Sequence, residues 1–90
     1  MTYSVHLSPH AARQYQRLDP SVRADVQAGI DALRRSPLAG PKVKGLKGAL
    51  REYWRYRVGD YRIVYAVDPR HRAVYVDYIQ HRKDVYRGAG

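Results

Sequence analysis

The chain begins with a short alternating pattern that passes directly into a helical one. Residues 2–7, "TYSVHL", carry apolar side chains at every second position, which is typical of a strand. Ser8 and Pro9 then suit the cap and the first position of a helix, because a serine hydroxyl accepts from a free backbone N–H and proline has none to satisfy. Apolar residues follow at helical spacing, namely Ala11, Tyr15 and Leu18.

Residues 19–37 predict a second, longer helix of the same design. Asp19 is the candidate cap and Pro20 the candidate first residue. The apolar stripe consists of Val22, Val26, Ile30 and Leu33. Arg34 and Arg35 stand where the helix dipole favours cations, and Pro37 stops the helix. We therefore expect two antiparallel helices with a very short turn, an αα-hairpin.

Glycines and a proline mark residues 38–50 as a loop, and from Glu52 the pattern changes to period two. One face of the strand in residues 52–58 carries Trp54, Tyr56 and Val58, and the other carries Tyr53, Arg55 and Arg57. Gly59-Asp60 is a two-residue hairpin signal. Residues 61–67 read as the next strand, residues 68–71 as a turn, and residues 73–79 as the last strand, which ends near Gln80.

The predicted order is therefore β-α-α-β-β-β in a single domain that spans residues 1–90. A chain of this length has room for one core. An N-terminal strand, an αα-hairpin and a C-terminal antiparallel three-strand meander, with the helices on one face, make a two-layer α+β fold.

Charge is the feature of the composition that changes this picture most. The net charge is +9, and residues 42–90 hold twelve basic and five acidic residues against five and three in residues 1–41. Thirteen of the seventeen basic residues are Arg, which favours bidentate contacts with phosphate. The C-terminal half thus suits a polyanionic partner, although a generally basic, soluble surface explains the composition about as well.

Two arginines of the predicted hairpin face each other. With Gly59 and Asp60 as loop residues, Arg57 falls directly opposite Arg62, and Arg55 shares their face. Like charges in such a pair destabilise a sheet, whereas a phosphate between them would turn repulsion into attraction. The alternative is a solvated face on which the long side chains splay apart.

Polar residues after the last strand add candidates to this site. His81, Arg82 and Tyr86 leave the sheet together, and Arg82 and Tyr86 share a face if the segment is helical. Singly, each suits a surface role. Near the three sheet arginines they supply a stacking ring, a cation and a titratable imidazole, as a single-stranded RNA site requires.

Other chemistries find little support in the sequence. There is no cysteine, which excludes disulfides and thiolate metal sites. His6 and His10 lack a third ligand, so no metal is expected. No phosphate-binding glycine loop occurs, and neither a signal peptide nor a membrane span is visible, which favours the cytoplasm.

Two segments, "VKGLKGALREYWRYRVGDYRIVYAV" and "VYVDYIQHRKDVYR", resemble the RelE/ParE superfamily of toxin–antitoxin toxins, nearer its RelE-type branch. The resemblance covers essentially the whole chain. It implies an endonuclease that cleaves mRNA codons in the ribosomal A site, without metal or other cofactor, by attack of the RNA 2′-hydroxyl on the adjacent phosphate. It places the functional residues of the family at Arg55, Arg57, Arg62, Arg82 and Tyr86. Further basic residues expected at the RNA are Lys44, Lys47, Arg51, Lys83 and Arg87.

One departure from the family concerns the base. The best-known RelE-type toxins carry lysines where this chain has Arg55 and Arg57, and arginine stays protonated. These arginines can stabilise a phosphorane, but the proton must go elsewhere. His81 is the favoured base and Tyr86 the stacking residue. Alternatively, the ribosome supplies the substrate geometry, and positioning and charge dominate.

The resemblance leaves two other functions open. One is a ParE-like inhibitor of DNA gyrase without nuclease activity, and the other is an inactive, RNA-binding relative. A toxin of this kind implies a cognate antitoxin, usually acidic, as partner in a hetero-oligomer, with an encounter hastened by charge complementarity. Only the nuclease requires mRNA on the ribosome.

Overall fold

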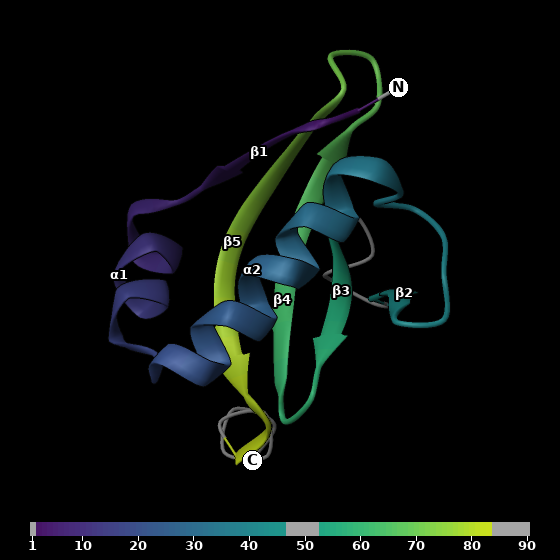
Figure 1. The fold of residues 1–90 in the computed structure, drawn as a ribbon. Coiled ribbons are helices and arrows are strands. Elements are labelled where there is room, and N and C mark those ends of the chain that lie inside the picture. The colour runs from purple at the N-terminus through teal and green to yellow at the C-terminus, as the bar shows by residue number, and fades with distance from the viewer. Residues whose placement is uncertain (1, 47–52, 84–90) are drawn as a thin grey trace.

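The computed structural model describes residues 2–46 and 53–83, which fold into a mixed sheet and two helices (Figure 1). In chain order the elements are β1 (Ser4–Leu7), α1 (Pro9–Arg17), α2 (Pro20–Arg35), β2 (Val43–Gly45), β3 (Tyr53–Val58), β4 (Tyr61–Asp68) and β5 (Ala73–His81). This confirms the predicted α+β architecture, with the N-terminal strand, the helix pair and the C-terminal meander of β3, β4 and β5. No helix among the described residues has the length and apolar character needed to cross a membrane.

The five strands lie in the order β1-β5-β4-β3-β2. β1 pairs with β5 in parallel, and the other neighbours are antiparallel. The assignment of residues 38–50 to a loop was wrong for β2, which pairs with β3 through Val43–Tyr56, Lys44–Arg55 and Gly45–Trp54. This strand has three residues, too few for the period of two to be recognised, and the glycines at 40 and 45 led to its assignment as loop.

The two helices begin where the sequence predicts, but only α1 is capped by a side chain. The Ser8 hydroxyl accepts a hydrogen bond from the Ala11 N–H at 3.0 Å. Asp19 occupies the N-cap position of α2 without a side-chain capping bond, so its expected role as a cap was wrong. Pro20 still begins the helix, since its fixed φ suits the first turn.

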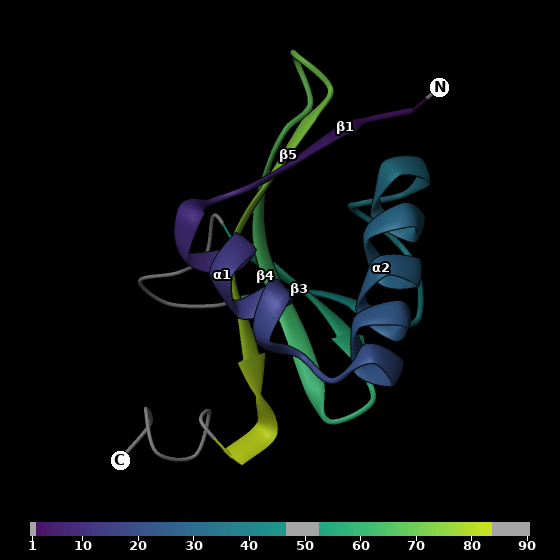
Figure 2. The same ribbon diagram turned by 60° about the vertical axis from the view of Figure 1, so that its left-hand side comes forward.

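Packing of α2 across one face of the sheet builds the core (Figures 1 and 2). Val26, Ile30 and Leu33 are buried there, as their spacing predicts. Tyr65 on β4 is also buried, and its hydroxyl donates to the Pro37 carbonyl at 2.6 Å. That bond satisfies the one polar atom of the ring, and burial raises the Tyr65 pKa far above its ordinary value. The tyrosine thereby ties the end of α2 to the sheet.

Helix α1 contributes Ala11 to the same core and also covers the edge of β5 beyond the short strand β1. The Ser8 hydroxyl donates to the Asp77 carbonyl at 2.6 Å, and the Ile79 N–H donates to the Gln14 side chain at 2.7 Å. Backbone groups that β1 does not reach are thus satisfied by side chains.

A bulge in β5 changes which residues face the core. Val64 pairs with Tyr78 but its neighbour Tyr65 pairs with Val76, so Asp77 is the extra residue. Val76 and Ile79 both belong to the core although they are three residues apart. Tyr78 therefore lies on the opposite face of the sheet, hereafter the open face, and not with the core as strict alternation would place it.

Gly29 permits the close approach of α2 to β3. A Cβ at this position would lie 3.0 Å from Tyr56 Cε1 and 3.1 Å from Val58 Cγ2, closer than a methyl group fits. A larger side chain would force a shift of Tyr56, Val58 or the helix itself, on the strand that carries Arg55 and Arg57 on its other face.

We predict that Gly29→Val destabilises the protein by about 2–3 kcal/mol, because overpacking outweighs the small gain in helix propensity of valine over glycine. Urea unfolding followed by circular dichroism measures the change. The matched control is Ala28→Val, which places valine at the neighbouring exposed position of α2 and should cost below about 1 kcal/mol. Equal losses for the two variants would contradict the close packing at Gly29.

Candidate functional site

The β3–β4 hairpin places Arg57 directly opposite Arg62, as the sequence predicts. Val58 pairs with Tyr61 across the two-residue turn, and φ is positive at Gly59 (+55°) and not at Asp60. This is the pattern of a type II′ turn, which requires glycine at its first position. The turn fixes the register without a bulge and therefore holds the two arginines on the open face.

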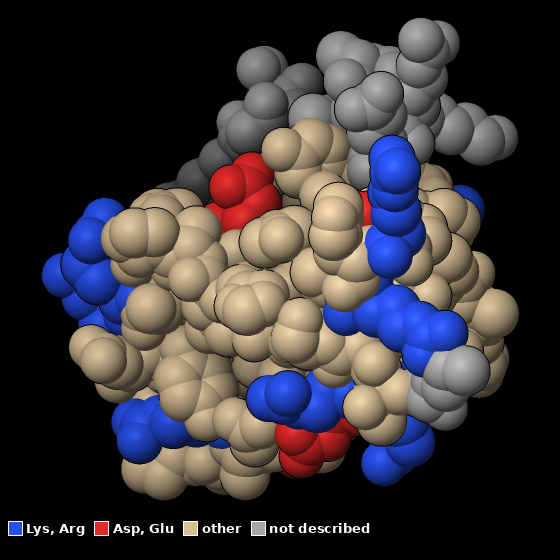
Figure 3. Space-filling model, turned by 90° about the horizontal axis from the view of Figure 1, so that it is seen from above, with Lys and Arg blue, Asp and Glu red and all other residues tan. Residues whose placement is uncertain are grey.

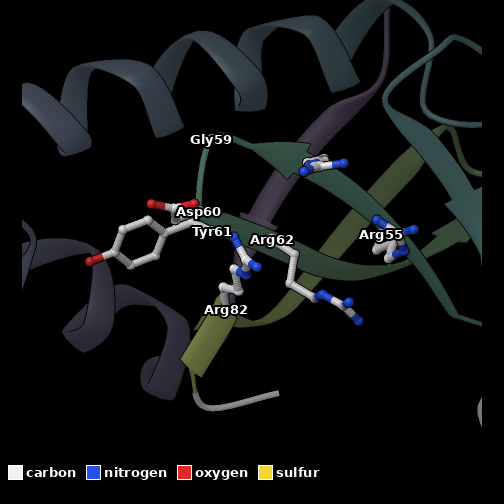
Figure 4. A pocket seen from close by; sticks show the side chains of 7 residues that line it. Arg55, Gly59, Asp60, Tyr61, Arg62 and Arg82 are labelled. Carbon is white, nitrogen blue, oxygen red and sulfur yellow. The ribbon is translucent and has the colours of Figure 1, made fainter. Parts of the chain in front are cut away.

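Four arginines line one cavity at this end of the sheet, which we call the arginine cavity. Its volume is about 330 Å³, and its lining is Arg55, Arg57, Arg62 and Arg82, with Gly59, Asp60 and Tyr61. Figure 4 shows the Arg55 and Arg62 side chains on one side of the hairpin, with Arg82 entering from the end of β5 and the Tyr61 ring directed away from them. Residues distant in sequence thus line one cavity.

Arg82 is held at the cavity by the hairpin itself. Its backbone N–H donates to the Asp60 carbonyl at 2.6 Å. The end of β5 and the Gly59–Asp60 turn accordingly lie at the same end of the sheet (Figure 1). The turn thereby positions both the sheet arginines and the arginine that follows the last strand.

Within the described part of the chain no ion pair neutralises the four guanidinium groups, and Asp60 is the one acidic residue that lines the cavity. The described residues form two ion pairs, Asp31–Arg34 and Asp68–His71, and neither involves the cavity. Burial, followed by the positive charges of Arg62 and Arg57, lowers the Arg55 pKa from its ordinary value. An anion with several oxygens would counter these positive charges.

Basic side chains elsewhere are arranged differently. Figure 3 looks onto the end of the molecule with the β4–β5 turn, and there the Lys and Arg side chains are mostly separated by uncharged surface. A generally basic surface has this appearance. The convergence of four arginines in one cavity is a separate feature that the total charge does not explain.

His81 does not line the arginine cavity. It lies opposite Tyr61 on the core side of the sheet, where the two rings meet edge to face at a centroid distance of 4.7 Å. Its Nδ1 accepts a hydrogen bond from the Lys83 N–H at 3.0 Å. In this arrangement a neutral ring carries its proton on Nε2, so taking up a second proton on Nδ1 requires that bond to break.

The remaining predicted residues divide into two groups. Lys44 lies opposite Arg55 and is exposed, and Lys83 is exposed beyond the end of β5. The others, Lys47, Arg51, Tyr86 and Arg87, lie outside the described residues. The structure therefore brings together the four arginines, with Lys44 beside them, but gives no position for the tyrosine expected to stack on the substrate.

The sequence patterns did not indicate that Tyr78 lies near the arginines. It lies on the open face opposite Val64, which itself pairs with Arg55. Burial and the charge of Asp77 raise the Tyr78 pKa, and the positive charge of Arg62 opposes that rise. The bulge at Asp77 places Tyr78 on this face. The sequence carries a sign of the bulge, because the spacing of buried apolar residues changes from two, between Val74 and Val76, to three, between Val76 and Ile79.

No metal-binding group of three histidines or acidic side chains occurs in the described ranges. His6 instead contacts the Ser4 hydroxyl through Nε2 at 3.0 Å and stacks on Tyr75. The described site offers cations, hydroxyls and rings, which suit a phosphate-bearing ligand.

Comparison with known proteins identifies the family of this chain. The family described as "ParE toxin of type II toxin-antitoxin system, parDE" matches residues 5–86. The toxin RelG of Mycobacterium tuberculosis is 33% identical over 88 residues, which cover 97% of this chain and 99% of RelG. The toxin RelE of the same organism is 34% identical over 87 residues, which cover 94% of this chain and 87% of RelE.

A solved structure shows the same fold at comparable identity. The crystal structure of the toxin–antitoxin complex RelBE2 from Mycobacterium tuberculosis contains a chain that is 30% identical, with a TM-score of 0.81. The match covers 91% of this chain and all of that one. On the family match, the sequence identity and the fold together, this protein belongs to the RelE/ParE superfamily of type II toxin–antitoxin toxins.

Proposed function

We propose that this toxin is a ribosome-dependent endonuclease that cleaves mRNA codons in the A site and so inhibits translation in the cytoplasm. The observation that carries the proposal is the arginine cavity, in which four guanidinium groups converge without an ion-pair partner in the described residues. A gyrase inhibitor that acts only by binding protein does not need a site that stabilises growing negative charge. A nuclease needs one, because negative charge grows on the phosphate during cleavage.

The proposed reaction is an internal transfer of the phosphate. The 2′-oxygen attacks the adjacent phosphorus, the bond from phosphorus to the 5′-oxygen breaks, and a 2′,3′-cyclic phosphate and a 5′-hydroxyl result. The proton lost from the 2′-hydroxyl is balanced by the one that the 5′-oxygen gains. Arg57 and Arg62 would hold the non-bridging oxygens from the two sides of the hairpin, with Arg55 and Arg82 completing the site.

The position of His81 argues against its role as the general base. As a base, His81 would have to turn from the core side of the sheet and give up its bond from the Lys83 N–H. Charge stabilisation with a substrate held in place by the ribosome needs no such rearrangement. We therefore propose that positioning and the arginines supply most of the rate, and that Tyr86 stacks on a substrate base.

The proposed partner is a cognate antitoxin of acidic character. The RelBE2 structure is a toxin–antitoxin complex, and 91% of this chain matches its toxin-like chain in fold. An acidic segment that covered the arginine cavity would neutralise its charge and compete with mRNA. Complementary charge would also speed association and make it sensitive to salt.

We predict that Arg62→Ala and Arg82→Ala each reduce cleavage of ribosome-bound mRNA by about 100-fold or more, as the loss of one group that stabilises the transition state does. Purified ribosomes programmed with mRNA, read by primer extension, give the rate. Arg70→Ala is the matched control, because it removes the same charge from the β4–β5 turn at the opposite end of the sheet.

Full cleavage activity in both cavity variants would rule out the arginine cavity as the nuclease site. Failure of the wild type to cleave, together with inhibition of purified gyrase, would favour the ParE-like alternative instead. RNA binding without cleavage on ribosomes would identify an inactive relative.

We further predict that His81→Gln lowers the cleavage rate by less than about 10-fold, since removal of a true general base costs about 100-fold or more. Single-turnover cleavage between pH 5.5 and 8 provides the measurement. A loss as large as that of Arg62→Ala, with a flattened pH profile, would instead make His81 the base.

A further inference from the structure

A second hollow lies on the open face, and aromatic side chains line it where the first is lined by arginines. Its volume is about 200 Å³. We call it the tyrosine groove and define it by His6, Tyr53, Ala66, Tyr75 and Asp77, with Leu7, Ser8 and Val76 completing the lining. Neither the sequence patterns nor the proposed chemistry assigns it a role.

The register of the sheet explains why a hollow forms here. Tyr53, Ala66, Tyr75 and His6 occupy one row across β3, β4, β5 and β1. Ala66 thus stands between two tyrosines, whose Cα atoms are separated by two strand spacings of about 5 Å each. A methyl group between two large rings leaves room for a planar ring above it, since van der Waals contact requires about 3.5–4 Å on either side.

One wall of the groove is already arranged for stacking. The rings of His6 and Tyr75 are stacked, with centroids 5.4 Å apart and planes inclined by 23°. Tyr75 is nevertheless 49% exposed, one of two large apolar side chains with such exposure in the described residues. An exposed, oriented ring is the feature on which unpaired bases stack in single-stranded RNA sites.

The groove and the arginine cavity lie on the same face and along the same strands. Arg62 and Ala66 are four residues apart on β4, a span of about 13 Å, and both side chains point to the open face. Between these rows stand Arg55 and Tyr78 on either side of Val64. A short RNA strand can therefore place its backbone at the arginines and a base at the groove.

Charge argues for a base and against a phosphate in the groove. Asp77 is the charged residue of this lining, and a carboxylate repels phosphate while it can accept from the amino groups of bases. From this geometry we propose that the tyrosine groove binds one base of the single-stranded RNA whose backbone lies in the arginine cavity. The inference rests on the proposed function, because both require RNA on this face.

The test measures affinity for a short labelled single-stranded RNA by fluorescence anisotropy, without ribosomes. Tyr75→Ala should weaken binding about 10-fold through the loss of one stacked base, and Tyr75→Phe should keep it, because the ring stacks and the hydroxyl does not. Leu38→Ala is the control, since Leu38 is the other exposed large apolar residue in the described chain, at 38%. Circular dichroism and thermal melting verify that each variant is folded.

A second variant tests the free volume above Ala66 and leaves the tyrosine rings in place. Ala66→Leu fills the floor of the groove while both tyrosines remain, and it should weaken binding by a similar factor. A set of RNAs, each lacking one base at a different position, completes a double-mutant cycle with Tyr75→Ala. One abasic position should weaken wild-type binding and add no further loss in Tyr75→Ala.

Affinity unchanged in both Tyr75→Ala and Ala66→Leu would overturn the proposal, as would an equal abasic effect at every position. Unchanged RNA binding with a weaker antitoxin complex would assign the groove to the protein partner and also overturn it. The proposed nuclease function stands or falls separately, on cleavage of ribosome-bound mRNA by the wild type. Coupled base binding without such cleavage would support the groove and reject the nuclease.

Discussion

The opposition of Arg57 and Arg62 across the β3–β4 hairpin is the constraint around which the site is arranged. Two like charges at directly paired positions oppose the pairing of the strands that carry them. The sheet tolerates this because the other face of the same strands is anchored in the core by Ile63 and Tyr65, with Tyr56 packed against it. The free energy lost at the open face is offset by burial on the core face, so that the site proposed for an anion is already formed before the anion binds.

The two faces of the sheet thus perform different tasks. The core face packs against α2, and Gly29 lets that helix come close enough to hold β3 in place. The open face presents cations at the hairpin end and rings toward β1, joined by the row of Arg55, Val64 and Tyr78. Such a division places the arginine cavity and the tyrosine groove on the same face, so that the RNA and the antitoxin proposed above would compete for it.

The sequence predicted the hairpin and the opposition of Arg57 and Arg62 because both follow from local rules. A glycine in a two-residue turn sets the register, and the register sets which residues are opposed. It did not predict the bulge at Asp77 or the strand β2, which depend on pairing with distant strands. The side of the sheet on which His81 lies follows from the bulge, since it reverses the alternation after Val76. The tyrosine groove was hidden for the same reason, because its row joins four strands far apart in the chain.

The most direct test of the central claim, that this pair of arginines is held for an anion, is the thermal stability of wild type and Arg62→Gln with and without inorganic phosphate at constant ionic strength. Without phosphate, Arg62→Gln should melt about 2–5 °C above the wild type, because it relieves the repulsion. Added phosphate should then raise the melting temperature of the wild type alone and close the difference. A variant that melts below the wild type in chloride, or equal shifts with phosphate in both proteins, would contradict the account.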